Sequence, residues 1–162
     1  MVYAIIFYEE VMIMKTVINI NNLSEMKALA QAMSQHLYAG FVLCLEGDLG
    51  AGKTTFTQFL GQAMGIQDPI NSPTFTILKL YENKLPLYHI DAYRLEGVGS
   101  DQELEEYIYG DGVCVVEWYS YIHESIPSAS LKMKIEWLSE EGRKVTLEGT
   151  DEYEKIVESL SH

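Results

Sequence analysis

Apolar residues return every three or four positions in several segments of the chain, which predicts helices with one buried face. The longest such series is Leu23, Met26, Leu29, Ala30, Met33 and Leu37. Asn22 and Glu25 stand three residues apart at its start, which is the spacing of a capping box. A second series is Phe56, Phe59, Leu60, Ala63 and Met64. It predicts a helix that ends at Gly65, and shorter helices are expected over residues 102–109 and 151–160.

Other segments alternate apolar and polar residues or are apolar throughout, and both patterns predict strands. Residues 15–20, 131–138 and 143–149 alternate, as strands with one buried face do. Residues 41–46 and 113–118 are nearly continuous apolar runs, which is typical of strands covered on both faces.

A further pair of strands is expected on either side of the turn at Glu82 and Asn83, as a β-hairpin. Strands and helices therefore alternate along most of the chain. This order predicts an α/β fold in which a mixed, central β-sheet is covered by helices. A length of 162 residues fits one domain of this kind.

The stretch EGDLGAGKTT, Glu46–Thr55, joins a predicted buried strand to a predicted helix and has few large side chains. It contains the pattern G-x-x-x-x-G-K-[ST], in which glycines let the backbone approach an anion closely. In this pattern the lysine reaches the β- and γ-phosphates and the hydroxyl binds Mg²⁺. We therefore expect a three-layer fold of the P-loop NTPase type. The residues expected to bind ATP are Gly47, Asp48, Leu49, Gly50, Ala51, Gly52, Lys53, Thr54 and Thr55.

Two carboxylates, Asp91 and Glu117, come directly after apolar strands and are candidates for the acidic residue that a P-loop enzyme needs beside the metal. Either could hold Mg²⁺ while the other orients the attacking water, and the pattern leaves both assignments open. Trp118 could cover a nucleotide base or a protein surface, or pack in the core. The loop Ser72-Pro73-Thr74 is a candidate switch that senses the γ-phosphate, or else a plain polar turn.

The composition narrows the choice of partners and cofactors. The net charge of −13 argues against direct, non-specific binding of nucleic acid, which requires lysine and arginine to neutralise phosphates. Cys44 and Cys114 lie in apolar runs and are expected to be buried free thiols. The four histidines lack the spacing of zinc ligands, so no zinc site is expected.

The first 13 residues need a separate interpretation. They are apolar from Val2 to Tyr8, but they lack a basic start and are too short to span a bilayer. Met14 begins a segment, MKTVINI, that could itself start a chain. We therefore expect residues 1–13 to be an N-terminal extension, variable or not native, and residues 14–162 to form a single P-loop ATPase domain. We expect a cytoplasmic protein without membrane contact.

Four motifs in this order, GDLGAGKTT, SPTF, HIDAYRL and VEW, resemble the TsaE family. Its members are small bacterial P-loop ATPases needed for the threonylcarbamoyladenosine modification of tRNA. The resemblance extends from about Ile20 to Gly149, and HIDAYRL with VEW makes it more specific than a P-loop alone. The sequence departs from the family at Tyr119, where a proline is frequent.

The resemblance implies roles for individual residues. Lys53, Asp91 and Glu117 would be catalytic, and Glu117 would bind the metal together with Thr54. Trp118 and Arg143 would lie near the nucleotide. Ser72, Pro73 and Thr74 would match the switch-like loop.

The resemblance also implies two protein partners of the sugar-kinase-like fold, one of which carries the transferase site. ATP hydrolysis, slow in the isolated chain, would support repeated turnover of that complex. The acidic composition agrees with an indirect contact to tRNA, through these partners. Two other classes stay open: a P-loop small-molecule kinase, and a binding module that uses the nucleotide as a switch. Only two arginines are present, Arg94 and Arg143, which disfavours a kinase because phosphoryl transfer to an anionic substrate needs several cations.

Overall fold

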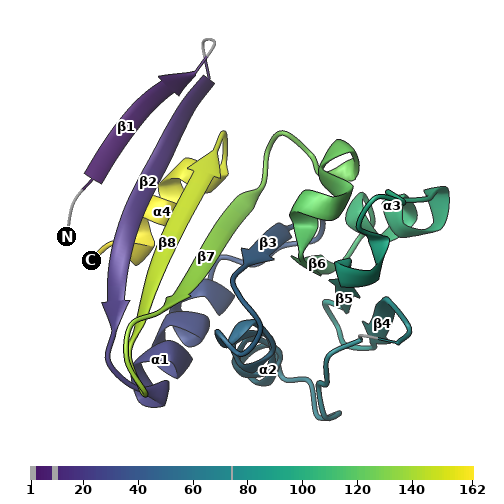
Figure 1. The fold of residues 1–162 in the computed structure, drawn as a ribbon, viewed down its shortest axis with the longest axis horizontal. Helices are drawn as coiled ribbons and strands as arrows, with labels where there is room; N and C mark the ends of the chain where they lie inside the picture. The colour runs from purple at the N-terminus through teal and green to yellow at the C-terminus, as the bar shows by residue number, and fades with distance from the viewer. Residues whose placement is uncertain (1–2, 9–10, 74) are drawn as a thin grey trace.

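One eight-stranded mixed sheet with helices on both faces organises the chain (Figure 1). The computed structural model describes residues 3–8, 11–73 and 75–162. The strands are β1 (Tyr3–Tyr8), β2 (Val11–Ile20), β3 (Val42–Glu46), β4 (Leu78–Tyr81), β5 (Leu87–Asp91), β6 (Val113–Glu117), β7 (Leu131–Trp137) and β8 (Arg143–Thr150). The α-helices are α1 (Leu23–Ser34), α2 (Lys53–Met64), α3 (Gln102–Ile108) and α4 (Tyr153–Leu160), and the 3₁₀ helices are η1 (Tyr93–Leu95) and η2 (Tyr119–Ser125). The expected three-layer α/β fold is confirmed.

The strand order β1-β2-β8-β7-β3-β6-β5-β4 places β3 inside the sheet, between β7 and β6. The pairs β7–β3, β3–β6 and β6–β5 are parallel, whereas the strands at both ends of the order pair antiparallel. The carboxyl ends of β3, β5 and β6 therefore meet at one edge. In α/β sheets this edge is where ligands bind.

Both faces of β3 are covered, which explains its continuous apolar sequence. Leu43 and Leu45 face the core shared with α1, α2 and α4, while Val42 and Cys44 face the core shared with α3 and η2. Cys44 and Cys114 are free and fully buried, as expected. Burial raises the pKa of the Cys44 thiol to about 12, so this thiol stays protonated.

Side-chain capping starts α1 as the Asn22 and Glu25 spacing predicted. The Asn22 side chain accepts a hydrogen bond from the Glu25 backbone N–H at 2.9 Å. The Glu25 carboxylate, however, accepts from the backbone N–H of Asn21 at 2.7 Å, one residue before the position a capping box requires. The helix ends at Ser34 and not at Leu37, because the backbone N–H groups of residues 35–37 bond carbonyls three residues back and no longer continue the α-helical pattern.

The N-terminal segment joins the sheet. Strand β2 begins at Val11, earlier than the predicted strand 15–20, and pairs antiparallel with β1 at the sheet edge. The domain boundary at residue 14 stays a prediction, but it falls inside β2. No helix in the described ranges is long and apolar enough to cross a membrane.

Candidate nucleotide site

The loop between β3 and α2 has an open surface, and its glycines serve different purposes. Gly50 and Gly52 have φ angles of 79° and 115°, which non-glycine residues rarely adopt. At Gly47 the constraint is space, because a Cβ would lie 2.5 Å from the carbonyl oxygen of Ile135. Gly52 is the N-cap of α2 and offers no side-chain cap, so the first N–H groups of this helix remain for a ligand.

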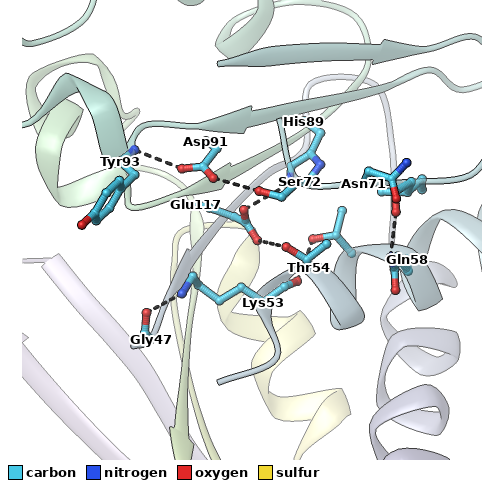
Figure 2. Close-up of polar contacts among 12 residues, drawn as sticks. Gly47, Lys53, Thr54, Gln58, Asn71, Ser72, His89, Asp91, Tyr93 and Glu117 are labelled. Atoms are coloured by element: carbon cyan, nitrogen blue, oxygen red, sulfur yellow. Dashed lines mark hydrogen bonds and ion pairs between the residues drawn. The ribbon is translucent and has the colours of Figure 1, made fainter. Parts of the chain in front are cut away.

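Lys53 is held at the base of this loop by neutral oxygens. Lys53 is 7% exposed. Its Nζ donates to the backbone carbonyl of Gly47 (Figure 2). It also donates to the backbone carbonyl of Asp48. Burial lowers the pKa of the Lys53 ammonium, and the carboxylates of Glu117, Asp91 and Asp48 act in the opposite direction. A bound phosphate would supply the negative charge that these carbonyls lack.

The two predicted carboxylates lie side by side. Asp91 and Glu117 end the adjacent parallel strands β5 and β6 and stand opposite each other in register. Glu117 Oε1 accepts a hydrogen bond from Thr54 Oγ1 at 3.3 Å. Asp91 accepts from Ser72 Oγ at 3.1 Å and from the backbone N–H of Tyr93 at 3.0 Å (Figure 2). Residues predicted from four separate segments thus converge in one pocket.

This pocket, here called the phosphate pocket, has a volume of about 270 Å³. Its lining residues are Leu49, Gly50, Gly52, Lys53, Thr54, Thr55, Ser72, Asp91, Tyr93, Glu117 and Trp118. Thr54 and Glu117 place a hydroxyl and a carboxylate oxygen together, and hard oxygen ligands are those that Mg²⁺ prefers. The described residues contain no group of three or more His, Cys, Asp or Glu arranged to hold a metal by themselves. This donor set fits Mg²⁺, which commonly takes one or two protein ligands and completes its shell with phosphates and water.

Trp118 forms an aromatic wall on the Lys53 side of the phosphate pocket. Its ring lies 4.6 Å from Lys53 Nζ, is stacked on Tyr121 at 5.7 Å and meets Tyr93 edge-on at 5.1 Å. Its backbone has a φ of 56°, which is unusual for an aromatic residue. Trp118 therefore lines the phosphate pocket next to Lys53.

The loop between β3 and α2 is here called the phosphate loop. A larger pocket, here called the α1 pocket, lies beside it and has a volume of about 460 Å³. Its lining residues are Ile20, Asn22, Leu23, Ser24, Met26, Gly50, Ala51, Gly52, Thr55, Glu140, Glu141 and Arg143. Gly50, Gly52 and Thr55 also line the phosphate pocket, so the two cavities are contiguous along the loop. Sequence reasoning missed the α1 side of this cavity, because it arises where Ile20 pairs with Arg143 across β2 and β8.

Arg143 connects the α1 pocket to the phosphate loop. Its Nε donates to the Ala51 carbonyl at 2.8 Å, and its Nη1 donates to the carbonyls of Ser139 and Gly142 at 3.0 and 2.8 Å. The guanidinium thus braces the loop from the β7–β8 turn.

The candidate switch loop contacts the site through Ser72, which donates to Asp91. The Pro73 carbonyl accepts from the backbone N–H of Ile77 at 2.7 Å. Thr74 lies outside the described residues. Phe75 is 84% exposed and lies under the Arg94 guanidinium at 4.7 Å. The residues that line the phosphate pocket include neither Arg94 nor Arg143.

Comparison with known proteins gives a consistent result. A family model described as threonylcarbamoyl adenosine biosynthesis protein TsaE matches residues 20–145. A Bacillus subtilis protein named tRNA threonylcarbamoyladenosine biosynthesis protein TsaE is 45% identical over 142 residues, which cover 86% of this chain and 90% of that protein. A Treponema pallidum protein of the same name is 40% identical over 113 residues, 68% of this chain and 84% of that protein. The crystal structure of Bacillus subtilis YdiB superposes with a TM-score of 0.78 at 37% identity, over 93% of this chain and 96% of that one.

Proposed function

The chain belongs to the TsaE family of threonylcarbamoyladenosine biosynthesis, and from this premise we propose that it is the Mg²⁺-dependent, ATP-hydrolysing subunit of that tRNA modification. The family model and the named relatives confirm the resemblance that the four motifs indicated. One observation carries the proposal. Four side chains, those of Lys53, Thr54, Asp91 and Glu117, converge on one pocket at the carboxyl ends of the parallel strands.

The two contiguous pockets suggest how ATP lies. Its triphosphate follows residues 47–55, with the β- and γ-phosphates in the phosphate pocket beside Lys53. Its nucleoside occupies the α1 pocket, where Arg143 fixes the loop through Ala51. In this arrangement Trp118 covers the phosphate end of the nucleotide and not the base.

The protein residues then have distinct tasks. Thr54 and Glu117 hold Mg²⁺, which when bound neutralises charge on the phosphate oxygens. Lys53 binds the β- and γ-phosphates and stabilises the charge that moves toward the leaving group. Asp91, held by Ser72 and by the Tyr93 backbone, orients the attacking water.

The proposal extends to protein partners. The chain acts in the cytoplasm with partners of the sugar-kinase-like fold, and its ATP hydrolysis supports repeated turnover of their transferase. Its net charge of −13 disfavours direct binding to the phosphates of tRNA, so the partners hold the tRNA.

The phosphate loop provides the direct test. Lys53→Ala removes a charge-assisted contact worth about 1.5–3 kcal/mol, so ATP affinity should fall roughly 10- to 100-fold. Hydrolysis should be lost as well. Binding is measured with a fluorescent ATP analogue and hydrolysis by phosphate release. Lys155→Ala, at an exposed position of α4, is the matched control. Wild-type affinity and turnover in Lys53→Ala would overturn the proposal.

A further inference from the structure

A buried histidine behind the site has no role in the function proposed so far. His89 lies on β5, two residues before Asp91, and its side chain is fully buried. Among the described residues, neither of its ring nitrogens has a hydrogen-bond partner. The nearest carboxylate oxygen is Glu117 Oε2, at 3.5 Å from His89 Nε2 (Figure 2).

Such a residue is expensive to keep in a fold. Burying a polar group without a hydrogen bond destabilises the folded state, and apolar side chains of similar volume would pack in the same space without that cost. His89 does not line the phosphate pocket, so it does not contact the nucleotide directly. Within the described part of the chain, the carboxylate that lies within ion-pair distance of His89 belongs to Glu117, which does line this pocket.

The two oxygens of Glu117 face different neighbours. Oε1 lies 3.3 Å from Thr54 Oγ1, on the side of the phosphate loop. Oε2 lies 3.5 Å from His89 Nε2, on the side of the sheet interior. The Glu117 carboxylate therefore lies between Thr54, which is expected to bind Mg²⁺, and His89, which lies outside the phosphate pocket.

We propose that His89 is a positioning residue for Glu117. In this role the His89 ring carries a proton on Nε2 and donates it in a hydrogen bond to Glu117 Oε2, which fixes the carboxylate so that Oε1 stays beside Thr54. Hydrogen-bond geometry that is long without ligand commonly tightens in the loaded site. Outer-sphere partners of this kind change metal affinity or activity by about 10- to 100-fold when removed. The inference rests on the proposed function, because it assigns Glu117 to the metal.

Three variants of His89 test the proposal. His89→Leu fills the volume without a donor, His89→Gln retains an amide near the position of Nε2, and His89→Asn has an amide that is too short to reach it. In His89→Leu the Mg²⁺ concentration for half-maximal turnover should rise about 10- to 100-fold. Mn²⁺ affinity, measured by electron paramagnetic resonance in the presence of a non-hydrolysable ATP analogue, should fall by a similar factor.

Recovery of metal affinity in His89→Gln distinguishes a positioning role of His89 from a purely structural one. ATP affinity in EDTA should be equal in the wild type and in all three variants, and His89→Gln should recover most of the metal affinity while His89→Asn should not. Equal metal affinity in the wild type and in His89→Leu would overturn the proposal. An equal loss in Gln, Asn and Leu variants would also overturn it, since only packing would then matter.

A second measurement needs no His89 variant and no nucleotide. Long-range ¹H–¹⁵N correlation spectra of the wild type should show the His89 ring protonated on Nε2, and Glu117→Gln should shift the Nε2 resonance. A proton on Nδ1, or an unchanged Nε2 resonance in Glu117→Gln, would overturn the proposal. If the wild type bound no Mg·ATP, the proposed function would fail, and these spectra would still decide whether His89 donates to Glu117.

Discussion

At the scale of single residues, the two carboxylates of the site differ in what holds them. Both oxygens of Asp91 accept hydrogen bonds from the protein, from Ser72 and from the Tyr93 backbone. Glu117 is contacted by Thr54, the hydroxyl that the P-loop pattern assigns to Mg²⁺. These surroundings support the proposed roles, in which Glu117 binds the metal and Asp91 orients the water.

This difference predicts opposite phenotypes for two conservative substitutions. Glu117→Gln should raise the Mg²⁺ concentration for half-maximal turnover, because it weakens a direct ligand. Asp91→Asn should lower turnover by about 10²- to 10⁴-fold while Mg·ATP binds nearly as in the wild type. Titration of Mg²⁺ at fixed ATP distinguishes the two.

Glu158→Gln, at an exposed position of α4, controls for the loss of one negative charge. The reverse pattern would exchange the two roles. Normal turnover in both variants would remove Asp91 and Glu117 from the site.

At the scale of elements, the site depends on a few strands and one helix. The loop joins β3 to α2, and the carboxylates end β6, which pairs with β3, and β5, which is the next strand in the sheet. Among the described strands, β1 pairs with β2 alone, and three strands separate β1 from β3 in the sheet order. In Figure 1, β1 lies at the edge of the sheet, away from α2.

This arrangement predicts that the first strand is dispensable for the site. Removal of residues 1–10 should leave ATP affinity within about twofold of the wild type, because changes at distant sites without shared contacts are nearly independent. The Tm should fall, since the β1–β2 pairing is lost. Calorimetry and a nucleotide-binding assay measure the two effects.

Removal of the C-terminal helix α4 should lower stability far more than removal of β1. Helix α4 buries Tyr153, Ile156, Val157 and Leu160, and the Tyr153 hydroxyl accepts from the Val42 backbone N–H at 2.9 Å. Losing four buried side chains, each worth about 2–5 kcal/mol, should unfold a chain that ends at Thr150. A large loss of ATP affinity on removal of β1 would contradict this account of the fold.

At the scale of the whole molecule, exposed apolar side chains lie at the opening of the phosphate pocket. Leu49 and Tyr93 line the pocket and are 76% and 44% exposed, and Phe75, in the segment after the candidate switch loop, is also exposed. The chain as a whole is acidic. A partner that covers this opening would contact both the nucleotide and the loop that Ser72 connects to Asp91.

Partner binding should therefore depend on the nucleotide. A ligand shifts a conformational equilibrium only through different affinities for the two states, so affinity for the partner complex should differ among ATP with Mg²⁺, ADP and no nucleotide. Turnover should be slow in the isolated chain and rise when the partners are added. Calorimetric titration in the three nucleotide states, with Lys53→Ala as control, measures this coupling.

Equal affinity in all three states, together with unchanged turnover, would rule out this switch. It would favour the small-molecule kinase among the alternatives that the sequence leaves open.

Local patterns in the sequence determined much of this protein. The glycines, Lys53 and Thr54 identify the phosphate loop, because their spacing is itself the chemical requirement of the site. The continuous apolar runs predict β3 and β6 as strands covered on both faces, and they place Cys44 and Cys114 in the core. These inferences need only neighbours along the chain.

Tertiary structure decided what depends on residues far apart in the chain. Strand order brings Asp91 opposite Glu117, and pairing of β2 with β8 brings Ile20 opposite Arg143 to form the α1 pocket. Burial of His89 against Glu117 likewise follows from the packing of β5 beside β6. No local pattern specifies such contacts, because periodicity shows which face of a strand is buried but not which strand lies beside it.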